Sequence, residues 1–268
     1  MTNPDRLLEV KCFLLDMDGT FFLGDRLIEG ALQFIQTIHK HECEFLFLTN
    51  NSSKASQQYA EKITRLGLPI GADRILTSGQ ATALHLQHQY AGGRVWVAGT
   101  PSLEAEFQTH GFQVVTDEPE VVVLGFDTTL TYNKLWRLCD LVRAGLPYIA
   151  THPDFNCPTE TGYMPDIGSL IACVAASTGR QPDLVIGKPN RLMAEAAATH
   201  VGRRLNQLAM IGDRLYTDIA LGVAAGILSI LVLSGESQIE DVSLSPHQPD
   251  YIFSHLGALA EHLESVYG

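Results

Sequence analysis

Short apolar runs recur along the chain, and each ends at glycine or polar residues. The runs are Val10–Leu15, Glu44–Leu48, Val185–Ile186, Leu208–Ile211 and Ile227–Leu233. Continuous apolar runs of this length are typical of parallel strands that are buried on both faces of a sheet. The helix-like segments that accompany them are Ser53–Gly67, Asn190–Val201 and Thr217–Gly226. The alternation of strands and helices predicts a doubly wound α/β fold with a parallel sheet.

A second α/β segment lies between about residue 82 and residue 183. Its strand candidates are Arg94–Ala98, Val121–Gly125 and Tyr148–Thr151. Its helix candidates are Ser102–His110, Thr131–Ala144 and Ser169–Thr178. We therefore expect residues 82–183 to form a smaller inserted domain, and residues 1–81 and 184–268 to form the two parts of the main domain.

The composition of the 268 residues is that of a globular protein, with 46% hydrophobic and 18% charged residues. The formal net charge of −12 argues against a nucleic-acid partner, because proteins that bind nucleic acids carry basic patches. Five cysteines without a C-x-x-C pair favour reduced thiols in the cytosol. The first residues lack signal-peptide features, and Ile219–Leu233, the longest apolar stretch, is shorter than the roughly 20 residues of a membrane span. We expect a cytoplasmic protein with no membrane partner.

Two carboxylates follow the first apolar run, at Asp16 and Asp18. Carboxylates that lie close together repel each other and need a cation between them, and Mg²⁺ prefers such oxygen ligands. One carboxylate can attack phosphorus to form an aspartyl phosphate, while the other protonates the leaving oxygen and later activates water. A D-x-D-G segment by itself is equally consistent with a polar turn.

Two later motifs are suited to binding phosphate. Thr49, Asn50 and Asn51 supply hydroxyl and amide groups between the second run and a helix N-terminus, where anions bind readily. Lys188 follows the third run and can offset the charge on a phosphoryl group. Taken singly, these motifs are also consistent with a helix cap and a surface lysine.

A fourth motif follows the run that ends at Ile211. Asp213 at this strand end can complete a metal site, and Asp218 at the next helix start can hold a metal-bound water or orient the lysine. Ligands of open α/β sheets bind at the carboxyl ends of the strands. We therefore expect Asp16, Thr49, Lys188 and Asp213 to gather at one edge of the sheet.

The four motifs DMDGT, LTNNSS, GKPN and GDRLYTD, in this order, resemble those of the haloacid dehalogenase (HAD) superfamily. The D-x-D form is similar to its phosphatase branch. The insertion between the second and third motifs resembles the C2 cap of the NagD-type (class IIA) sugar and nucleotide phosphatases. The resemblance implies an HAD-like, Rossmann-type core with a C2 cap at residues 82–183.

The resemblance also implies roles for single residues. Asp16 is expected to be the nucleophile and Asp18 the general acid and base. Mg²⁺ is expected to be held by the Asp16 side chain, the Asp18 backbone carbonyl and Asp213, with Asp218 beside these ligands. The residues expected to bind the phosphoryl group are Thr49, Asn50, Asn51 and Lys188.

Two cap segments depart from the family pattern. His152 stands where a stretch that usually reads A-T-N-P-D has asparagine, and Pro165-Asp166-Ile167-Gly168-Ser169 departs from the common P-G-A-G-S. These departures leave the core chemistry unaffected but bear on the choice of substrate, since the cap selects the leaving group in this family.

The expected function is Mg²⁺-dependent hydrolysis of small phosphorylated metabolites, such as sugar phosphates or nucleoside monophosphates. Two alternatives are phosphotransfer to another hydroxyl and small-molecule binding by a protein that has lost catalysis. Related phosphotransferases carry a helical cap between the first two motifs, and the about 30 residues from Asp18 to Thr49 are too few for one. Similar proteins form dimers through the cap, so a homo-oligomer is one alternative for the oligomeric state of this chain.

Overall fold

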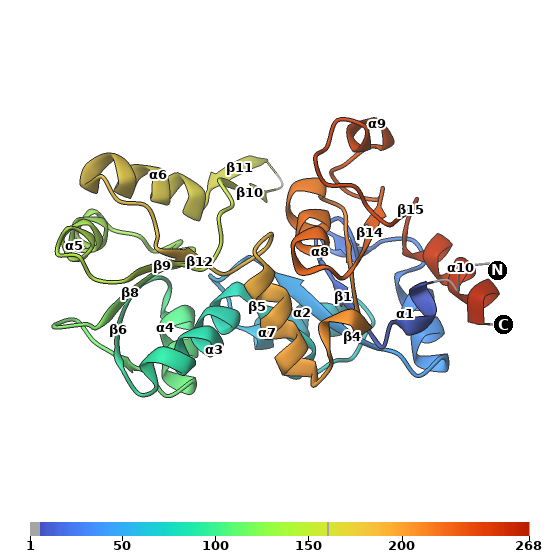
Figure 1. Cartoon of the computed structure of the whole chain (residues 1–268), viewed down its shortest axis with the longest axis horizontal. Helices are drawn as coiled ribbons and strands as arrows, with labels where there is room; N and C mark the ends of the chain where they lie inside the picture. The colour runs from blue at the N-terminus through green and yellow to red at the C-terminus, as the bar shows by residue number, and fades with distance from the viewer. Residues whose placement is uncertain (1–5, 160, 268) are drawn as a thin grey trace. The chain divides into compact units, whose positions relative to one another are not determined.

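The computed structural model describes residues 6–159 and 161–267, which form two compact units (Figure 1). The core unit comprises the chain up to residue 48, residues 60–76 and the chain from residue 188. The insert unit comprises residues 49–59 and 77–187. The division at residues 82 and 183 stays a prediction.

The core unit contains a six-stranded sheet in the order β15-β14-β13-β1-β4-β5. Its strands are β1 (Cys12–Leu15), β4 (Glu44–Thr49), β5 (Ile75–Thr77), β13 (Leu208–Gly212), β14 (Leu228–Val232) and β15 (Tyr251–Phe253). β1 lies in the middle and pairs in parallel with both β13 and β4. Every residue of β1, β13 and β14 is buried, which explains why their sequences are uninterrupted apolar runs.

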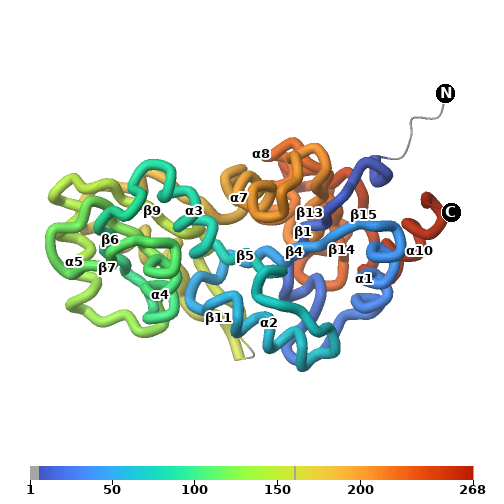
Figure 2. The backbone as a smooth tube through the Cα atoms, turned by 90° about the horizontal axis from the view of Figure 1, so that it is seen from below, coloured from blue at the N-terminus to red at the C-terminus, as the bar shows by residue number. Residues whose placement is uncertain are grey.

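Helices cover both faces of this sheet (Figure 2). α1 packs against α10, and α7 packs against α8. The helices are α1 (Ala31–Lys40), α2 (Ser56–Arg65), α7 (Arg191–Val201), α8 (Ala220–Ala225), α9 (Ile239–Val242) and α10 (Leu256–Tyr267). A short hairpin follows β1, formed by β2 (Phe22–Leu23) and β3 (Arg26–Leu27). The predicted doubly wound α/β fold with a parallel sheet is confirmed.

The insert unit contains a five-stranded sheet in the order β12-β9-β8-β6-β7. Its strands are β6 (Arg94–Ala98), β7 (Gln113–Val114), β8 (Val121–Leu124), β9 (Tyr148–Ala150) and β12 (Leu184–Val185). Its helices are α3 (Ser78–Tyr90), α4 (Pro101–Thr109), α5 (Tyr132–Arg143) and α6 (Ile167–Thr178). α3 and α4 lie on one face of the sheet, and α5 and α6 lie on the other (Figure 1). A hairpin of β10 (Asn156–Thr159) and β11 (Gly162–Pro165) leads into α6.

The predicted helices of the insert are confirmed to within two residues at each end. Polar side chains start them: Thr100 caps α4, Thr131 caps α5 and Asp166 caps α6, each by accepting a hydrogen bond from a backbone N–H. Sequence patterns of this kind act within one helical turn, so the sequence is enough to place these helices. No helix in the two described stretches is long and apolar enough to cross a membrane.

The assignment of Val185–Ile186 to the main sheet was wrong. β12 pairs in parallel with β9 in the insert, where Leu184 lies opposite Ile149 and Val185 opposite Ala150. An apolar run indicates a strand but not its neighbour, because the pairing depends on contacts that are distant in sequence. The segment from Thr217 also differs from the prediction, since a π-helical turn over Leu215–Ile219 precedes α8.

Candidate active site

Lys188 joins two carboxylates that come from different parts of the core unit. Asp16 follows β1, and Asp218 lies in the π-helical turn after β13. Lys188 Nζ donates to Asp16 Oδ1 at 2.5 Å and to Asp218 Oδ1 at 2.6 Å. Burial would lower the pKa of Lys188, but the charges and hydrogen bonds of Asp16 and Asp218 outweigh that effect and raise it. Lys188 is therefore a fixed positive charge between two carboxylates.

Asp213 lies next to this group, directly after β13. Its Oδ2 accepts a hydrogen bond from the Glu236 N–H at 2.7 Å, and its Oδ1 accepts one from the Thr20 hydroxyl at 3.4 Å. Within residues 6–159 and 161–267, no ion pair links Asp213 to a cationic side chain. Burial and the charges of Asp16 and Asp218 raise the pKa of Asp213 to about 7. This carboxylate lacks the positive charge that Lys188 gives to its neighbours.

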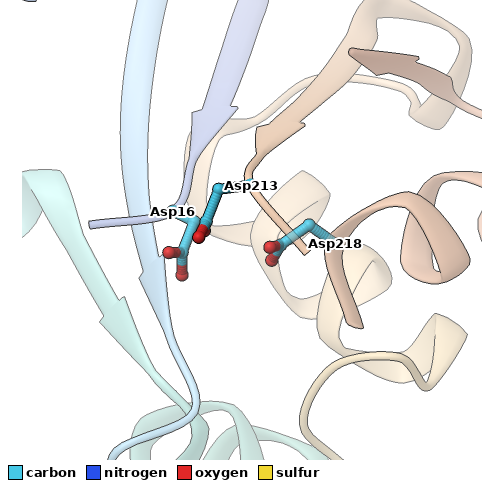
Figure 3. Close-up of side chains that lie close together, drawn as sticks. All are labelled: Asp16, Asp213 and Asp218. Atoms are coloured by element: carbon cyan, nitrogen blue, oxygen red, sulfur yellow. The ribbon is translucent and has the colours of Figure 1, made fainter. Parts of the chain in front are cut away.

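The three carboxylates converge in a way that suits a divalent cation. One oxygen each from Asp16, Asp213 and Asp218 lie within 4.8 Å of one another. Figure 3 shows the Asp16 and Asp213 side chains side by side, with the Asp218 carboxylate facing them. Carboxylate oxygens around a space of this size are ligands that a hard cation such as Mg²⁺ prefers. Lys188 bonds to both Asp16 and Asp218, so among the described residues Asp213 is the carboxylate of this group that has no ion pair.

Gly19 makes room for the Asp213 carboxylate. Its φ is +86°, in the left-handed region that favours glycine. A Cβ atom at this position would lie 2.4 Å from Asp213 Oδ2. The side chain of neighbouring Asp18 is exposed to solvent.

The loop Ser234–Ser237 follows β14 and encloses Asp213, a role that was not predicted from the sequence. Its contacts are the Ser234 hydroxyl to the Gly19 carbonyl at 2.8 Å, the Glu236 N–H to Asp213 Oδ2, and the Ser237 N–H to the Asp213 carbonyl at 3.1 Å. A Cβ atom on Gly235 would lie 2.0 Å from Asp213 Oδ2. The only available signal was a Ser-Gly pair after an apolar run, which also fits an ordinary turn.

Arg214 and Tyr216 contact this loop through the Glu236 side chain. Arg214 Nε lies 3.0 Å from Glu236 Oε2, and the Tyr216 hydroxyl donates to Glu236 Oε1 at 2.7 Å. The Glu236 side chain therefore ties the loop to the segment between Asp213 and Asp218. Neither Arg214 nor Tyr216 was singled out from the sequence.

Thr49, Asn50 and Asn51 belong to the insert unit. The Thr49 side chain accepts a hydrogen bond from the Asn51 N–H at 3.1 Å, which closes a tight turn directly after β4. The Asn50 amide donates to both carboxylate oxygens of Asp154, at 3.1 and 3.2 Å. The predicted gathering of Asp16, Lys188 and Asp213 is confirmed, whereas phosphate binding by the Thr49 turn stays a prediction.

The two positions that depart from the family pattern contact each other. His152 Nε2 lies 3.0 Å from Asp166 Oδ1, and both side chains are buried in the insert unit. Nothing in the sequence indicates that these residues, 14 positions apart, form a pair.

Comparison with known proteins agrees with this arrangement. Residues 13–113 match the haloacid dehalogenase-like hydrolase family, and residues 185–259 match a family described as HAD-hydrolase-like. An acid sugar phosphatase from Staphylococcus epidermidis is 34% identical over 255 residues, which cover 95% of this chain and 98% of that one.

Solved structures give the same result. A 4-nitrophenylphosphatase from Thermotoga maritima superimposes with a TM-score of 0.93 at 46% identity, covering 96% of this chain and 98% of that one. A glycerol phosphate phosphatase from Mycobacterium tuberculosis in complex with magnesium has a TM-score of 0.89 at 33% identity, covering 97% and 79%. The chain therefore belongs to the haloacid dehalogenase-like hydrolase family. The predicted resemblance to NagD-type phosphatases is confirmed, and so is the prediction that the chain is a phosphatase.

Proposed function

We propose that this phosphatase hydrolyses phosphomonoesters of small metabolites, such as sugar phosphates or nucleoside monophosphates, through an aspartyl phosphate on Asp16 and with the help of Mg²⁺. The observation that carries the proposal is the buried group in which Lys188 bonds to both Asp16 and Asp218 while Asp213 stands beside them. A phosphate dianion would be repelled by three carboxylates alone, so this site needs the lysine and a metal ion.

The Asp16 side chain, the Asp18 backbone carbonyl and Asp213 would hold Mg²⁺. When bound, the ion offsets the negative charge of the carboxylates and of the phosphoryl oxygens. Three features of the chain fit this role: the convergence of the carboxylate oxygens, the absence of a salt bridge to Asp213 among the described residues, and the room that Gly19 leaves beside it.

In the first step, an Asp16 oxygen attacks phosphorus and the bond from phosphorus to the leaving oxygen breaks. Asp18 gives its proton to that oxygen, so the product departs as an alcohol. In the second step, Asp18 takes a proton from water, which attacks phosphorus and releases inorganic phosphate from Asp16. Lys188 offsets the charge on the phosphoryl group, and Thr49, Asn50 and Asn51 bind its oxygens.

The activities named for the related proteins support small phosphomonoesters as the substrate class. The matched proteins are a sugar phosphatase, a nitrophenylphosphatase and a glycerol phosphate phosphatase. Their substrates share a phosphomonoester and differ in the leaving group. This is consistent with a core site that acts on the phosphoryl group and a separate part of the chain that selects the rest.

The test is a screen of p-nitrophenyl phosphate and a panel of metabolite phosphomonoesters, measuring kcat/KM with Mg²⁺ and after treatment with EDTA. We expect phosphate release that requires Mg²⁺, and no turnover by Asp16→Asn. Asp73→Asn is the matched control, because the Asp73 side chain is 76% exposed and lies in the same unit.

Rapid quenching followed by mass spectrometry of the intact protein should detect one added phosphoryl group in the wild type and none in Asp16→Asn. Retained turnover in Asp16→Asn would refute the assignment of the nucleophile. Undiminished activity after thorough chelation would refute the role of the metal ion. Product analysis with an added alcohol acceptor separates hydrolysis from phosphotransfer.

A further inference from the structure

A buried polar chain runs through the insert unit, and the proposed chemistry does not use it. His152 is fully buried, and both of its ring nitrogens have polar neighbours. Nε2 faces Asp166 Oδ1 at 3.0 Å, whereas Nδ1 faces the Thr151 hydroxyl at 3.2 Å and the Ser78 hydroxyl at 3.3 Å. A carboxylate only accepts hydrogen bonds, so His152 donates to Asp166 through Nε2.

Asp166 has a second task in the same place. Its Oδ1 also accepts a hydrogen bond from the Ile167 N–H at 2.6 Å, at the start of α6. The Gly168 N–H in the first turn of this helix donates to the Asp154 carbonyl at 2.7 Å. The segment from His152 to Asp154 is therefore held against the N-terminus of α6 by both a side-chain and a backbone contact.

The chain of contacts reaches Asn50 by two routes. The Ser78 hydroxyl, which faces His152 Nδ1, donates to the Asn50 carbonyl at 2.5 Å. The Asp154 carboxylate, two residues after His152, accepts from the Asn50 side-chain amide. The backbone and the side chain of Asn50 are thus both held by groups next to His152: Ser78 lies against its ring, and Asp154 follows it by two residues.

Ser78, His152 and Asp166 have the residue types of a hydrolytic triad, but they cannot act as one. The Ser78 side chain is fully buried, and its single hydroxyl hydrogen is used in the bond to Asn50. No substrate carbonyl can reach that oxygen. The arrangement serves to fix positions rather than to carry out a separate reaction.

We infer that His152 and Asp166 are a positioning pair that holds Asn50 in the conformation that binds the phosphoryl group. Asp166 orients the imidazole, the imidazole packs against the Ser78 hydroxyl and fixes its place, and that hydroxyl donates to the Asn50 carbonyl. The inference rests on the proposed phosphate-binding role of Asn50. It assigns to two buried residues of the insert an effect on phosphate affinity, although neither touches the phosphate.

Two substitutions of His152 separate its contacts. His152→Gln keeps a donor near the position of Nε2, toward Asp166, and loses the group near Nδ1. His152→Asn keeps a polar group near Nδ1, toward Ser78, and loses the contact with Asp166. Ser78→Ala removes only the hydroxyl that links His152 to Asn50.

The experiment measures two quantities for each variant: the affinity for inorganic phosphate, by calorimetry in the presence of Mg²⁺, and kcat and KM with p-nitrophenyl phosphate. Ser78→Ala removes the hydrogen bond to the Asn50 carbonyl, and His152→Gln removes the ring atoms that hold the Ser78 hydroxyl in place. We expect each variant to weaken phosphate binding by about fivefold, the size of one lost hydrogen bond, and to raise KM similarly. In the Ser78→Ala background, His152→Gln should cause no further loss, because it disturbs only the Ser78 route, which is already broken, and keeps the contact with Asp166 on the side of the Asp154 route.

Two controls separate positioning from a general loss of stability. Val174→Ala creates a cavity under α6, where Val174 is fully buried, without touching the polar chain. His88→Gln changes an exposed histidine of the same unit. Both controls should leave phosphate affinity within about twofold of the wild type, even though Val174→Ala lowers the melting temperature.

Unchanged phosphate affinity in His152→Gln and Ser78→Ala would overturn the inference, as would fully additive losses in the double variant. The inference would also be overturned if the phosphate affinities of Val174→Ala and His152→Gln both fell in proportion to their melting temperatures. Should His152→Gln not fold, Ser78→Ala decides alone. In each of these cases, the wild type still hydrolyses p-nitrophenyl phosphate and the proposed function stands. A wild type that neither hydrolyses it nor binds phosphate would overturn both.

Discussion

Lys188→Met removes the central cation of the site while keeping most of the volume of the side chain. Lys188 is only 3% exposed, and its ammonium group bonds to Asp16 and Asp218. The substitution leaves the Asp218 side chain, which has no exposed surface, beside two further carboxylates. We therefore expect a large loss of stability in the protein without metal.

The size of the loss follows from the burial of the two partners. Removing one member of a buried charge pair costs about 3–5 kcal/mol, because the remaining charge stays uncompensated. The Asp16 side chain is 16% exposed and keeps some contact with water, so most of the cost arises at Asp218. For a unit of this size, each kcal/mol corresponds to about 2–4 °C, so we expect the melting temperature to fall by about 6–20 °C.

The assay is thermal unfolding in EDTA at pH 8, followed by circular dichroism. Lys11→Met is the control, because Lys11 is exposed and directly precedes β1 in the same unit. Its melting temperature should stay within about 2 °C of the wild type. If Lys188→Met melted within the same 2 °C, the argument that a buried cation holds the carboxylates together would be refuted.

The same region leads to two further predictions. Gly235→Ala should weaken Mg²⁺ binding by about tenfold, since a Cβ atom would displace the Asp213 carboxylate. Gly24→Ala is the control and should leave Mg²⁺ binding unchanged, because there is open space around Gly24. Titration with Mn²⁺ followed by electron paramagnetic resonance checks this, and equal affinities would contradict it. In EDTA, the melting temperature should rise as the pH falls from 8 to 6, because Asp213, with its pKa raised to about 7, takes up a proton in the folded protein that the unfolded chain does not. Differential scanning calorimetry should show a weaker rise in Asp213→Asn, and an equal rise would contradict the assignment to Asp213.

Much of the candidate site could be predicted because its residues stand in recognisable local contexts. Asp16 and Asp213 directly follow buried strands, and the apolar runs before them mark those strands. Parallel strands bring their carboxyl ends to one edge, so the meeting of these side chains followed from the predicted fold. The helices of the insert were also predicted from local patterns, and in the structure their caps Thr100, Thr131 and Asp166 each bond within one turn of their own helix.

The parts that could not be predicted depend on partners that are distant in sequence. Val185 reads as a strand, but its neighbour Ala150 in the insert became clear only from the folded chain. The loop at Gly235 reads as a turn, although it closes over Asp213. Nothing in the sequence around Arg214 indicates that Glu236 is its partner.

By itself, the sequence determined the order of strands and helices, the α/β class and the identity of the polar residues after the strands, because apolar runs and capping groups act over a few residues. Only the tertiary structure decided which of these groups bond to each other. Lys188 and Asp16 are 172 positions apart and bond only because the fold brings the start of α7 to the end of β1. The same holds for the His152–Asp166 pair, whose contact depends on how a loop packs against the start of a helix.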